Sequence, residues 1–127
     1  MKIIDAHSHI GNFGSWARFD FDLARLKEQM EKFGIERTLL SGACAGDCAS
    51  VLDAFQKEPG LVVPVAWVKP GGPEAIAEMR RLVERDGFRA FKLHPLFDAY
   101  CADDSIVDPV LDLAEELQIP VFIHSGH

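Results

Sequence analysis

Two histidines near the amino terminus are spaced so that they could bind one metal ion. Asp5, His7 and His9 follow a short apolar run and alternate with small residues. Alternate residues of a strand point to the same face, so a strand here would place all three side chains together. Neutral imidazole is a good ligand for zinc and related metals. The spacing therefore predicts a metal site at this strand end, although two unrelated surface histidines would give the same pattern.

Two more histidines stand at the ends of later apolar runs. His94 and His124 each end a run rich in Val, Ile, Leu or Phe, and His127 follows shortly after the second. Parallel α/β proteins place their chemistry at the carboxyl ends of their strands. We therefore expect His124 to lie at the same rim as His7 and His9. For His94, a structural role in capping its strand is an equally open reading.

Five strand-like runs alternate with four helical patterns along the chain. The runs are continuously apolar, as in strands buried on both faces, and cover residues 2–9, 37–43, 61–68, 88–94 and 120–124. Apolar residues recur at helical spacing within residues 23–33, 48–55, 76–83 and 107–117. This order predicts parallel βαβ units within a single domain, residues 1–127.

The predicted helices carry capping residues at their ends. Asp20 or Asp22 can cap the first helix, which Gly34 would end, and Asp47 precedes the second helix. Pro73 stands in the first turn of the third helix, where its missing N–H has no cost.

Two architectures contain this alternation of strands and helices. A complete (β/α)₈ barrel needs about 250 residues, so length favours an open, doubly wound sheet. Against that reading, the sequence stops directly after its fifth strand, before the helix that would cover it. It also has no Gly-x-Gly-x-x-Gly motif and no phosphate-binding P-loop.

Composition narrows the classes of partner. A hydrophobic content of 48% and a charged content of 26% fit an ordinary soluble domain. The formal net charge of −7, without a basic run, argues against binding to nucleic acid or to an anionic membrane, and leaves a small-molecule substrate as the expected partner. Three cysteines do not make a disulfide framework and fit a reducing compartment, so we expect a cytoplasmic protein.

Three segments together resemble the amidohydrolase superfamily, in particular its amidohydrolase-related branch. They are residues 5–9 (Asp-Ala-His-Ser-His), 87–95 (Gly-Phe-Arg-Ala-Phe-Lys-Leu-His-Pro) and 119–126 (Ile-Pro-Val-Phe-Ile-His-Ser-Gly). Members of this superfamily are (β/α)₈ barrels that bind a divalent metal. The resemblance implies an α/β fold in which this chain is the amino-terminal half, about five strands, of a TIM barrel.

The resemblance also implies the site. His7, His9 and His124 match metal ligands, with Zn²⁺ as the expected ion and Mn²⁺ as the alternative. The implied activity is hydrolysis of an amide, ester or lactone by a metal-activated water. The general-base Asp of the eighth strand and a sixth-strand His have no counterpart here. We therefore expect no catalytic residue within this chain, the base beyond residue 127, and no activity from the 127 residues alone.

Two other functions remain open from the sequence. A non-oxidative decarboxylase of the same fold shares the first-strand motif. A small, non-catalytic α/β binding module would instead take Mg²⁺ at acidic residues of the rim. Asp98, Asp103 and Asp104 follow the fourth strand; we read them as a solvated loop, with selection of a cationic substrate as the alternative.

Lys92 shares parity with His94 and should point into the barrel near its rim. A buried lysine is costly unless it is paired. It could form an ion pair with Asp5, bind a substrate carboxylate, or be carbamylated and bridge two metals, as in distant branches of the superfamily. We therefore expect Asp5, Lys92 and His94 to contact the substrate or to support the metal ligands.

A five-stranded part of a barrel leaves its first and fifth strands as open edges. Unpaired strand edges invite pairing with another chain. We therefore expect self-association, or pairing with a chain that supplies the rest of the barrel.

Overall fold

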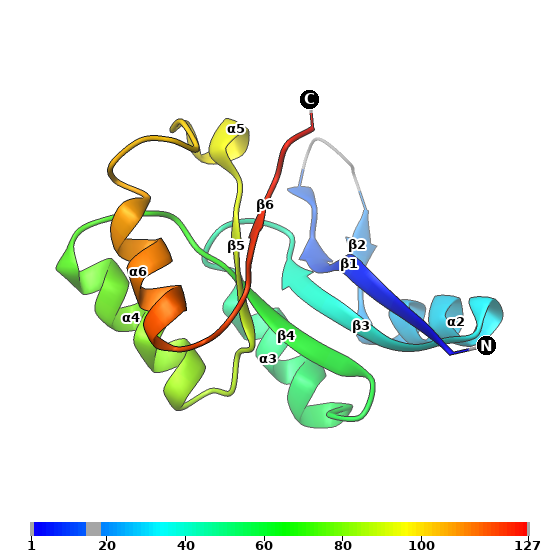
Figure 1. Cartoon of the computed structure of the whole chain (residues 1–127). Coiled ribbons are helices and arrows are strands. Elements are labelled where there is room, and N and C mark those ends of the chain that lie inside the picture. The colour runs from blue at the N-terminus through cyan, green and yellow to red at the C-terminus, as the bar shows by residue number, and fades with distance from the viewer. Residues whose placement is uncertain (1, 15–18, 127) are drawn as a thin grey trace.

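The computed structural model describes residues 2–14 and 19–126 as one curved sheet with helices along its outer side (Figure 1). Figure 1 labels the elements, which in chain order are β1 (Ile3–Asn12), β2 (Asp20–Phe21), α2 (Leu23–Phe33), β3 (Ile35–Gly42), α3 (Cys48–Lys57), β4 (Val62–Trp67), α4 (Pro73–Glu84), β5 (Ala90–Leu93), α5 (Pro95–Asp98), α6 (Asp108–Glu116) and β6 (Val121–Ile123). His127 lies outside the described residues.

The strand order in the sheet is β2-β1-β3-β4-β5-β6, and every pair except β1 with β2 is parallel. Apart from the short antiparallel strand β2, the strands therefore lie side by side in the order in which they follow one another in the chain. A doubly wound sheet reverses its strand order at a switch point, whereas a barrel adds strands in one direction. The topology thus confirms parallel βαβ units of the TIM-barrel type, and the open doubly wound sheet that length alone favoured is wrong.

The predicted helix ends are those of the structure. The Asp22 side chain accepts a hydrogen bond from the Arg25 N–H at the start of α2, and Gly34 ends this helix with a left-handed backbone, φ 67°. Asp47 caps α3 in the same way. Pro73 is the first residue of α4.

Two short elements were not predicted. The two-residue strand β2 pairs antiparallel with the end of β1, and it is too short to show a periodic pattern. The single-turn helix α5 begins because the His94 ring accepts a hydrogen bond from the Phe97 N–H and Pro95 fixes the first turn. The strand predicted over 88–94 is shorter in the structure, where β5 covers Ala90–Leu93 and the chain turns into α5 at His94.

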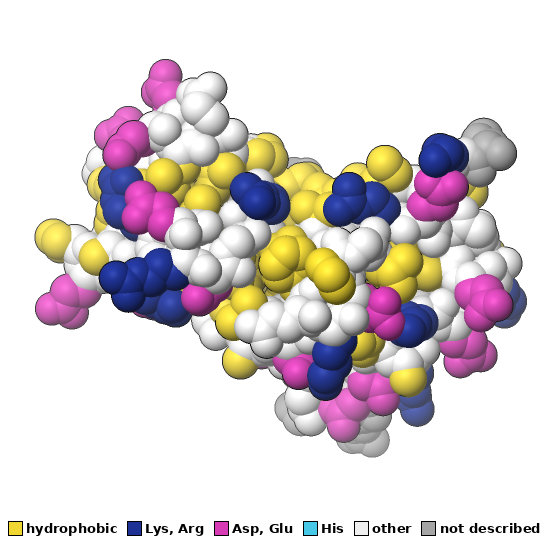
Figure 2. All heavy atoms as spheres, turned by 90° about the horizontal axis from the view of Figure 1, so that it is seen from below, with side chains coloured by type: hydrophobic (Ala, Val, Ile, Leu, Met, Phe, Trp, Pro, Cys, Tyr) yellow, Lys and Arg dark blue, Asp and Glu magenta, His cyan; other side chains and the backbone are white. Residues whose placement is uncertain are grey.

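The core lies between the sheet and the helices. Leu40 of β3, Val62 of β4 and Phe91 of β5 are fully buried against apolar side chains of the helices, such as Val51 of α3. On the surface seen from below, hydrophobic side chains gather in the middle of the molecule, with charged side chains beside them and at the margin (Figure 2). Because the core fills the space between the sheet and the helices, the inner face of the sheet is left to carry the polar groups described next.

None of the helices in the described parts of the chain is long and apolar enough to cross a membrane.

Candidate metal centre

His9 is the most firmly held imidazole of the rim. Its Nδ1 lies 2.7 Å from the Gly42 carbonyl oxygen at the end of β3, and a carbonyl can only accept a hydrogen bond. Nδ1 therefore carries the proton, and Nε2 keeps its lone pair. Burial lowers the pKa of His9 to about 4, against the opposing effect of the Gly42 hydrogen bond. At neutral pH the ring is therefore uncharged, as a metal ligand must be.

His7 lies beside His9 on the inner face of β1. The two Nε2 atoms are 3.1 Å apart, and the rings meet edge to face. Two nitrogens that bind one ion at about 2.0–2.1 Å in tetrahedral geometry are themselves separated by about 3.3 Å. Burial lowers the pKa of His7, and the nearby ammonium of Lys92 lowers it further. The structure thus brings together two of the three predicted metal ligands.

A β-bulge separates Asp5 from these histidines. Asp5 pairs in register with Thr38 of β3, whereas His9 pairs with Ser41, and the register shifts between Asp5 and Ser8. Thr38 and Ser41 are three positions apart on β3, so they and their partners Asp5 and His9 face opposite sides of the sheet. The predicted shared face of Asp5, His7 and His9 is therefore wrong for Asp5. The Asp5 carboxylate instead accepts a hydrogen bond from the His7 N–H, 3.0 Å, and so holds the bulge from which His7 projects.

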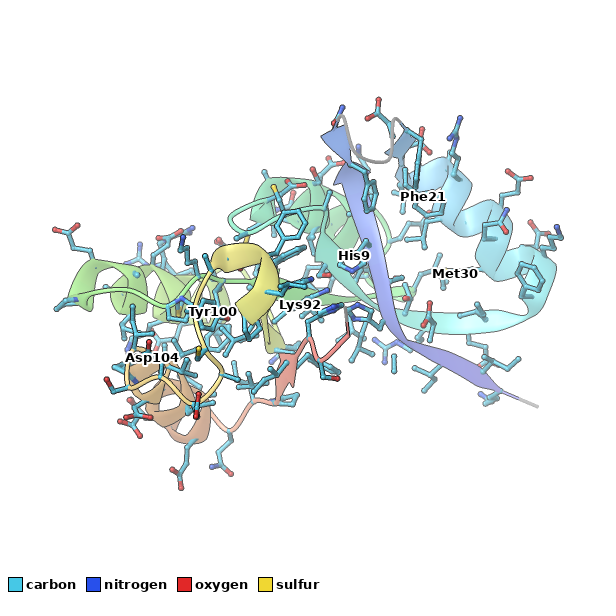
Figure 3. All side chains as sticks on the ribbon, turned by 90° about the horizontal axis from the view of Figure 1, so that it is seen from above. His9, Phe21, Met30, Lys92, Tyr100 and Asp104 are labelled. Carbon is cyan, nitrogen blue, oxygen red and sulfur yellow. The ribbon has the colours of Figure 1, made fainter. Side chains whose placement is uncertain are left out.

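Lys92 points into the same group of side chains from β5. Its side chain is buried, with the residue 2% exposed, and its Nζ lies 3.1 Å from His7 Nε2 and 3.0 Å from His9 Nε2 (Figure 3). Burial lowers the pKa of Lys92 to about 8. Lys92 takes no part in the ion pairs of the described residues, so the predicted pair with Asp5 is not formed. The ammonium is held by imidazoles and, 4.7 Å from the ring centroid, by Trp67.

His94 and His124 stack face to face, with ring centroids 3.8 Å apart. Burial and then His124 lower the pKa of His94. His124 lines a cavity of about 350 Å³ together with His7, Lys92 and Phe122. Within residues 2–14 and 19–126, however, no three His, Cys, Asp or Glu side chains are gathered as a metal-binding group. His124 thus borders the same cavity as His7, and its role as third ligand stays a prediction.

Trp67 is the site residue that sequence reasoning missed. It ends β4, is 4% exposed, and contacts the rings of His9 and His94. Trp67 lies at a strand end, which is the signal that identified the histidines, and the same signal could have identified this aromatic residue. Asp98, predicted to be solvated, is half-buried and accepts a hydrogen bond from Trp67 Nε1, 2.9 Å.

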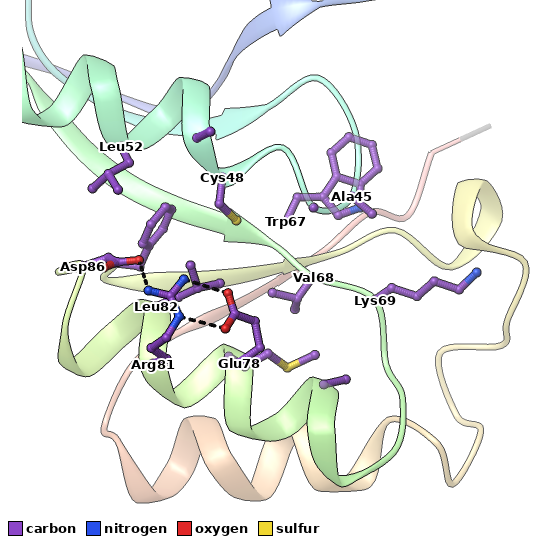
Figure 4. Close-up of a pocket in the computed structure, with 15 residues that line it drawn as sticks. Ala45, Cys48, Leu52, Trp67, Val68, Lys69, Glu78, Arg81, Leu82 and Asp86 are labelled. Atoms are coloured by element: carbon purple, nitrogen blue, oxygen red, sulfur yellow. Dashed lines mark hydrogen bonds and ion pairs between the residues drawn. The ribbon is translucent and has the colours of Figure 1, made fainter.

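A larger cavity, about 580 Å³, lies between α3 and α4 (Figure 4). Leu52, Met79 and other apolar side chains line it. Arg81 lies at its wall and pairs with both Glu78 and Asp86, so two carboxylates share one guanidinium. It contains none of the predicted site residues.

The sequence of this chain matches the profile of a known protein family. The family profile described as "Amidohydrolase" matches residues 4–127. The chain belongs to the amidohydrolase family. No curated protein sequence gives a significant match to it.

Solved structures share the fold of this amidohydrolase chain at low sequence identity. A 5-carboxyvanillate decarboxylase from Novosphingobium aromaticivorans, complexed with manganese and 4-hydroxy-3-methoxy-5-nitrobenzoic acid, has a TM-score of 0.80 and 16% identity over 98% of this chain and 50% of its own. A probable 2-pyrone-4,6-dicarboxylic acid hydrolase from Acinetobacter baumannii, with citric acid bound, has a TM-score of 0.74 and 18% identity over 99% and 50%. An uncharacterised TIM-barrel protein from Bordetella bronchiseptica has a TM-score of 0.78 and 21% identity over 100% and 56%.

This amidohydrolase chain thus spans about half the length of the structures that it matches. Both a hydrolase and a decarboxylase are among them, so the fold does not decide between the two reactions. The prediction that the chain forms about half of a TIM barrel is confirmed.

Proposed function

We propose that this chain carries the metal-binding histidines of a metal-dependent hydrolase that acts on an amide, ester or lactone. The observation that carries the proposal is the pair of Nε2 atoms of His7 and His9, 3.1 Å apart, of which the His9 atom carries a lone pair and no proton. His124, which lines a cavity together with His7, would supply a third imidazole. The Gly42 carbonyl, which fixes the tautomer of His9, plays the supporting part that such groups play around bound metals.

The residues of this chain would bind and orient, while the general base would come from outside residues 1–127. A divalent metal, when bound, supplies an activated water and polarises the scissile carbonyl. Imidazole ligands suit zinc, and manganese is the alternative because a similar structure was determined with that metal. Lys92 would hold an anionic group of the substrate beside the two histidines.

A decarboxylase is the second candidate, and the burial of Lys92 favours it. A buried ammonium without a carboxylate partner gains most from a substrate that brings one. The similar 5-carboxyvanillate decarboxylase was determined with a benzoic acid derivative, a molecule of that kind. The hydrolase and the decarboxylase share the metal centre and differ in the bond that breaks.

A cobalt titration tests the shared metal centre. Co²⁺ replaces Zn²⁺ at imidazole sites and reports its ligands in its visible spectrum. We expect one Co²⁺ per chain, with binding lost in His7→Ala and His9→Ala and retained in the doubly substituted control Asp103→Asn/Asp104→Asn. Binding that the histidine variants keep and the control loses would overturn the proposal and support the carboxylate-based binding module.

A further inference from the structure

Three stacked rings form a column across the rim from β4 to β6. The Trp67 indole stacks on the His94 ring with centroids 5.1 Å apart and an interplanar angle of 14°. The His94 ring also stacks on His124, with centroids 3.8 Å apart and again 14°. The column therefore links the end of an interior strand, β4, to the histidine that follows β6, the edge strand of the sheet in the described residues.

The inner end of the column is anchored by hydrogen bonds. Trp67 Nε1 donates to the Asp98 carboxylate, 2.9 Å, and Asp98 is the last residue of α5. The same short helix fixes His94, because His94 Nδ1 accepts from the Phe97 N–H, 3.2 Å. Phe97 also meets the Trp67 and His94 rings edge to face. Trp67 and His94 thus form one rigid unit with α5.

His124 lacks anchors of this kind. Its backbone N–H donates to the Leu93 carbonyl, but its ring makes no hydrogen bond to any residue in the described parts of the chain. This contrasts with His9, whose ring is fixed by the Gly42 carbonyl. Within the described structure, the orientation of the His124 ring is set by its stacking on His94.

We propose that Trp67 and Asp98 are positioning residues, which act through His94 to orient the His124 imidazole toward the cavity that it shares with His7. The inference rests on the proposed function, because a metal ion is what the oriented His124 ring would bind. The stacking of the column itself can be tested in metal-free protein. Groups that orient a metal ligand change metal affinity by about 10- to 100-fold when they are removed. The Asp98 side chain accepts from Trp67, whereas its backbone N–H donates to the His94 carbonyl, 2.9 Å, so replacing the side chain removes the first hydrogen bond and leaves the second.

The experiment compares four variants by two readouts. Asp98→Ala removes the acceptor, Asp98→Asn keeps a carbonyl oxygen that accepts from the indole, and Trp67→Leu removes the ring at the inner end of the column. Leu96→Ala, at an exposed position in the same helix, is the matched control. The first readout is the proton chemical shift of the His124 ring in metal-free protein, which stacking displaces. The second is the dissociation constant for Zn²⁺.

We expect Asp98→Ala and Trp67→Leu to move the His124 ring protons toward the shifts of an unstacked histidine and to weaken zinc binding by about tenfold. Asp98→Asn and Leu96→Ala should stay close to the parent protein in both readouts. Unchanged His124 shifts in both Asp98→Ala and Trp67→Leu would overturn the proposal, as would zinc binding that equals the parent's in both. If the parent chain binds no zinc, the proposed function fails, and the His124 shifts still decide whether the column positions that ring.

Discussion

The ammonium of Lys92 lies 3.0 Å from His9 Nε2 and 3.1 Å from His7 Nε2, at the nitrogens that we assign to a metal. An ammonium can only donate hydrogen bonds, so at His9 it uses the lone pair that a metal ion would use. A bound cation and this hydrogen bond therefore exclude each other. Lys92 must turn away, or lose its proton, when metal binds.

Replacing the lysine should accordingly strengthen metal binding. Lys92→Met keeps the length of the side chain and removes a positive charge beside the ligands, so the dissociation constant for Zn²⁺ should fall by about tenfold. Isothermal titration calorimetry measures it, with Lys69→Met at an exposed position as the control. Loss of zinc binding in Lys92→Met would instead show that the lysine is itself a ligand, as the carbamylated form would be.

The stability of the metal-free protein should fall as the pH is lowered from about 6.5 to about 4. His9 has a pKa of about 4 in the folded protein and an ordinary pKa of 6.5 in the unfolded chain, so in this window the unfolded chain takes up a proton that the folded chain does not. The contribution of His9 to the free energy of unfolding is complete above pH 6.5 and is lost as the pH falls to about 4. Urea unfolding at several pH values measures the slope.

His9→Gln should reduce that slope without removing it. His7 and His94 also have lowered pKa values and contribute in the same direction. A slope that is the same in His9→Gln and in the parent protein would mean that His9 is not buried as a neutral ring.

The open edge of β6 predicts self-association. Ile123 in this strand is 45% exposed, and within the described residues β6 pairs only with β5. Apolar strand edges pair with other strands, and a charged residue on such an edge opposes pairing. Sedimentation velocity should show species larger than 14.1 kDa for the parent chain and a shift toward monomer for Ile123→Lys. The matched control is Leu111→Lys, at a 40% exposed position on α6. A parent chain that sediments as a monomer would refute this prediction.

Much of the fold could be predicted because its signals are local. Capping residues such as Asp22 and Gly34 act within one turn of the helix that they start or end. Continuously apolar runs separated by helices predict parallel strands wherever they occur. The order of the strands depends on tertiary packing, which is why length alone favoured the wrong architecture.

The site was harder to predict because contacts across strands decide it. The alternation of side chains along a strand correctly predicted that His7 lies beside His9, but it failed for Asp5. A β-bulge arises from the pairing of two strands, which the spacing of residues within one strand does not show. Lys92 was correctly placed inside, yet its neighbours are imidazoles from β1 that are distant in sequence. The stacking of Trp67 on His94 likewise depends on the register between β4 and β5.

The most direct test of the account is the anomalous diffraction of crystals grown with zinc and measured at the zinc edge. We expect one strong peak per chain, with the Nε2 atoms of His7 and His9 at about 2.0–2.1 Å and Lys92 turned away from both. A peak bound by the carboxylates of Asp103 and Asp104, or no peak within reach of the two histidines at saturating zinc, would contradict the assignment of the metal centre.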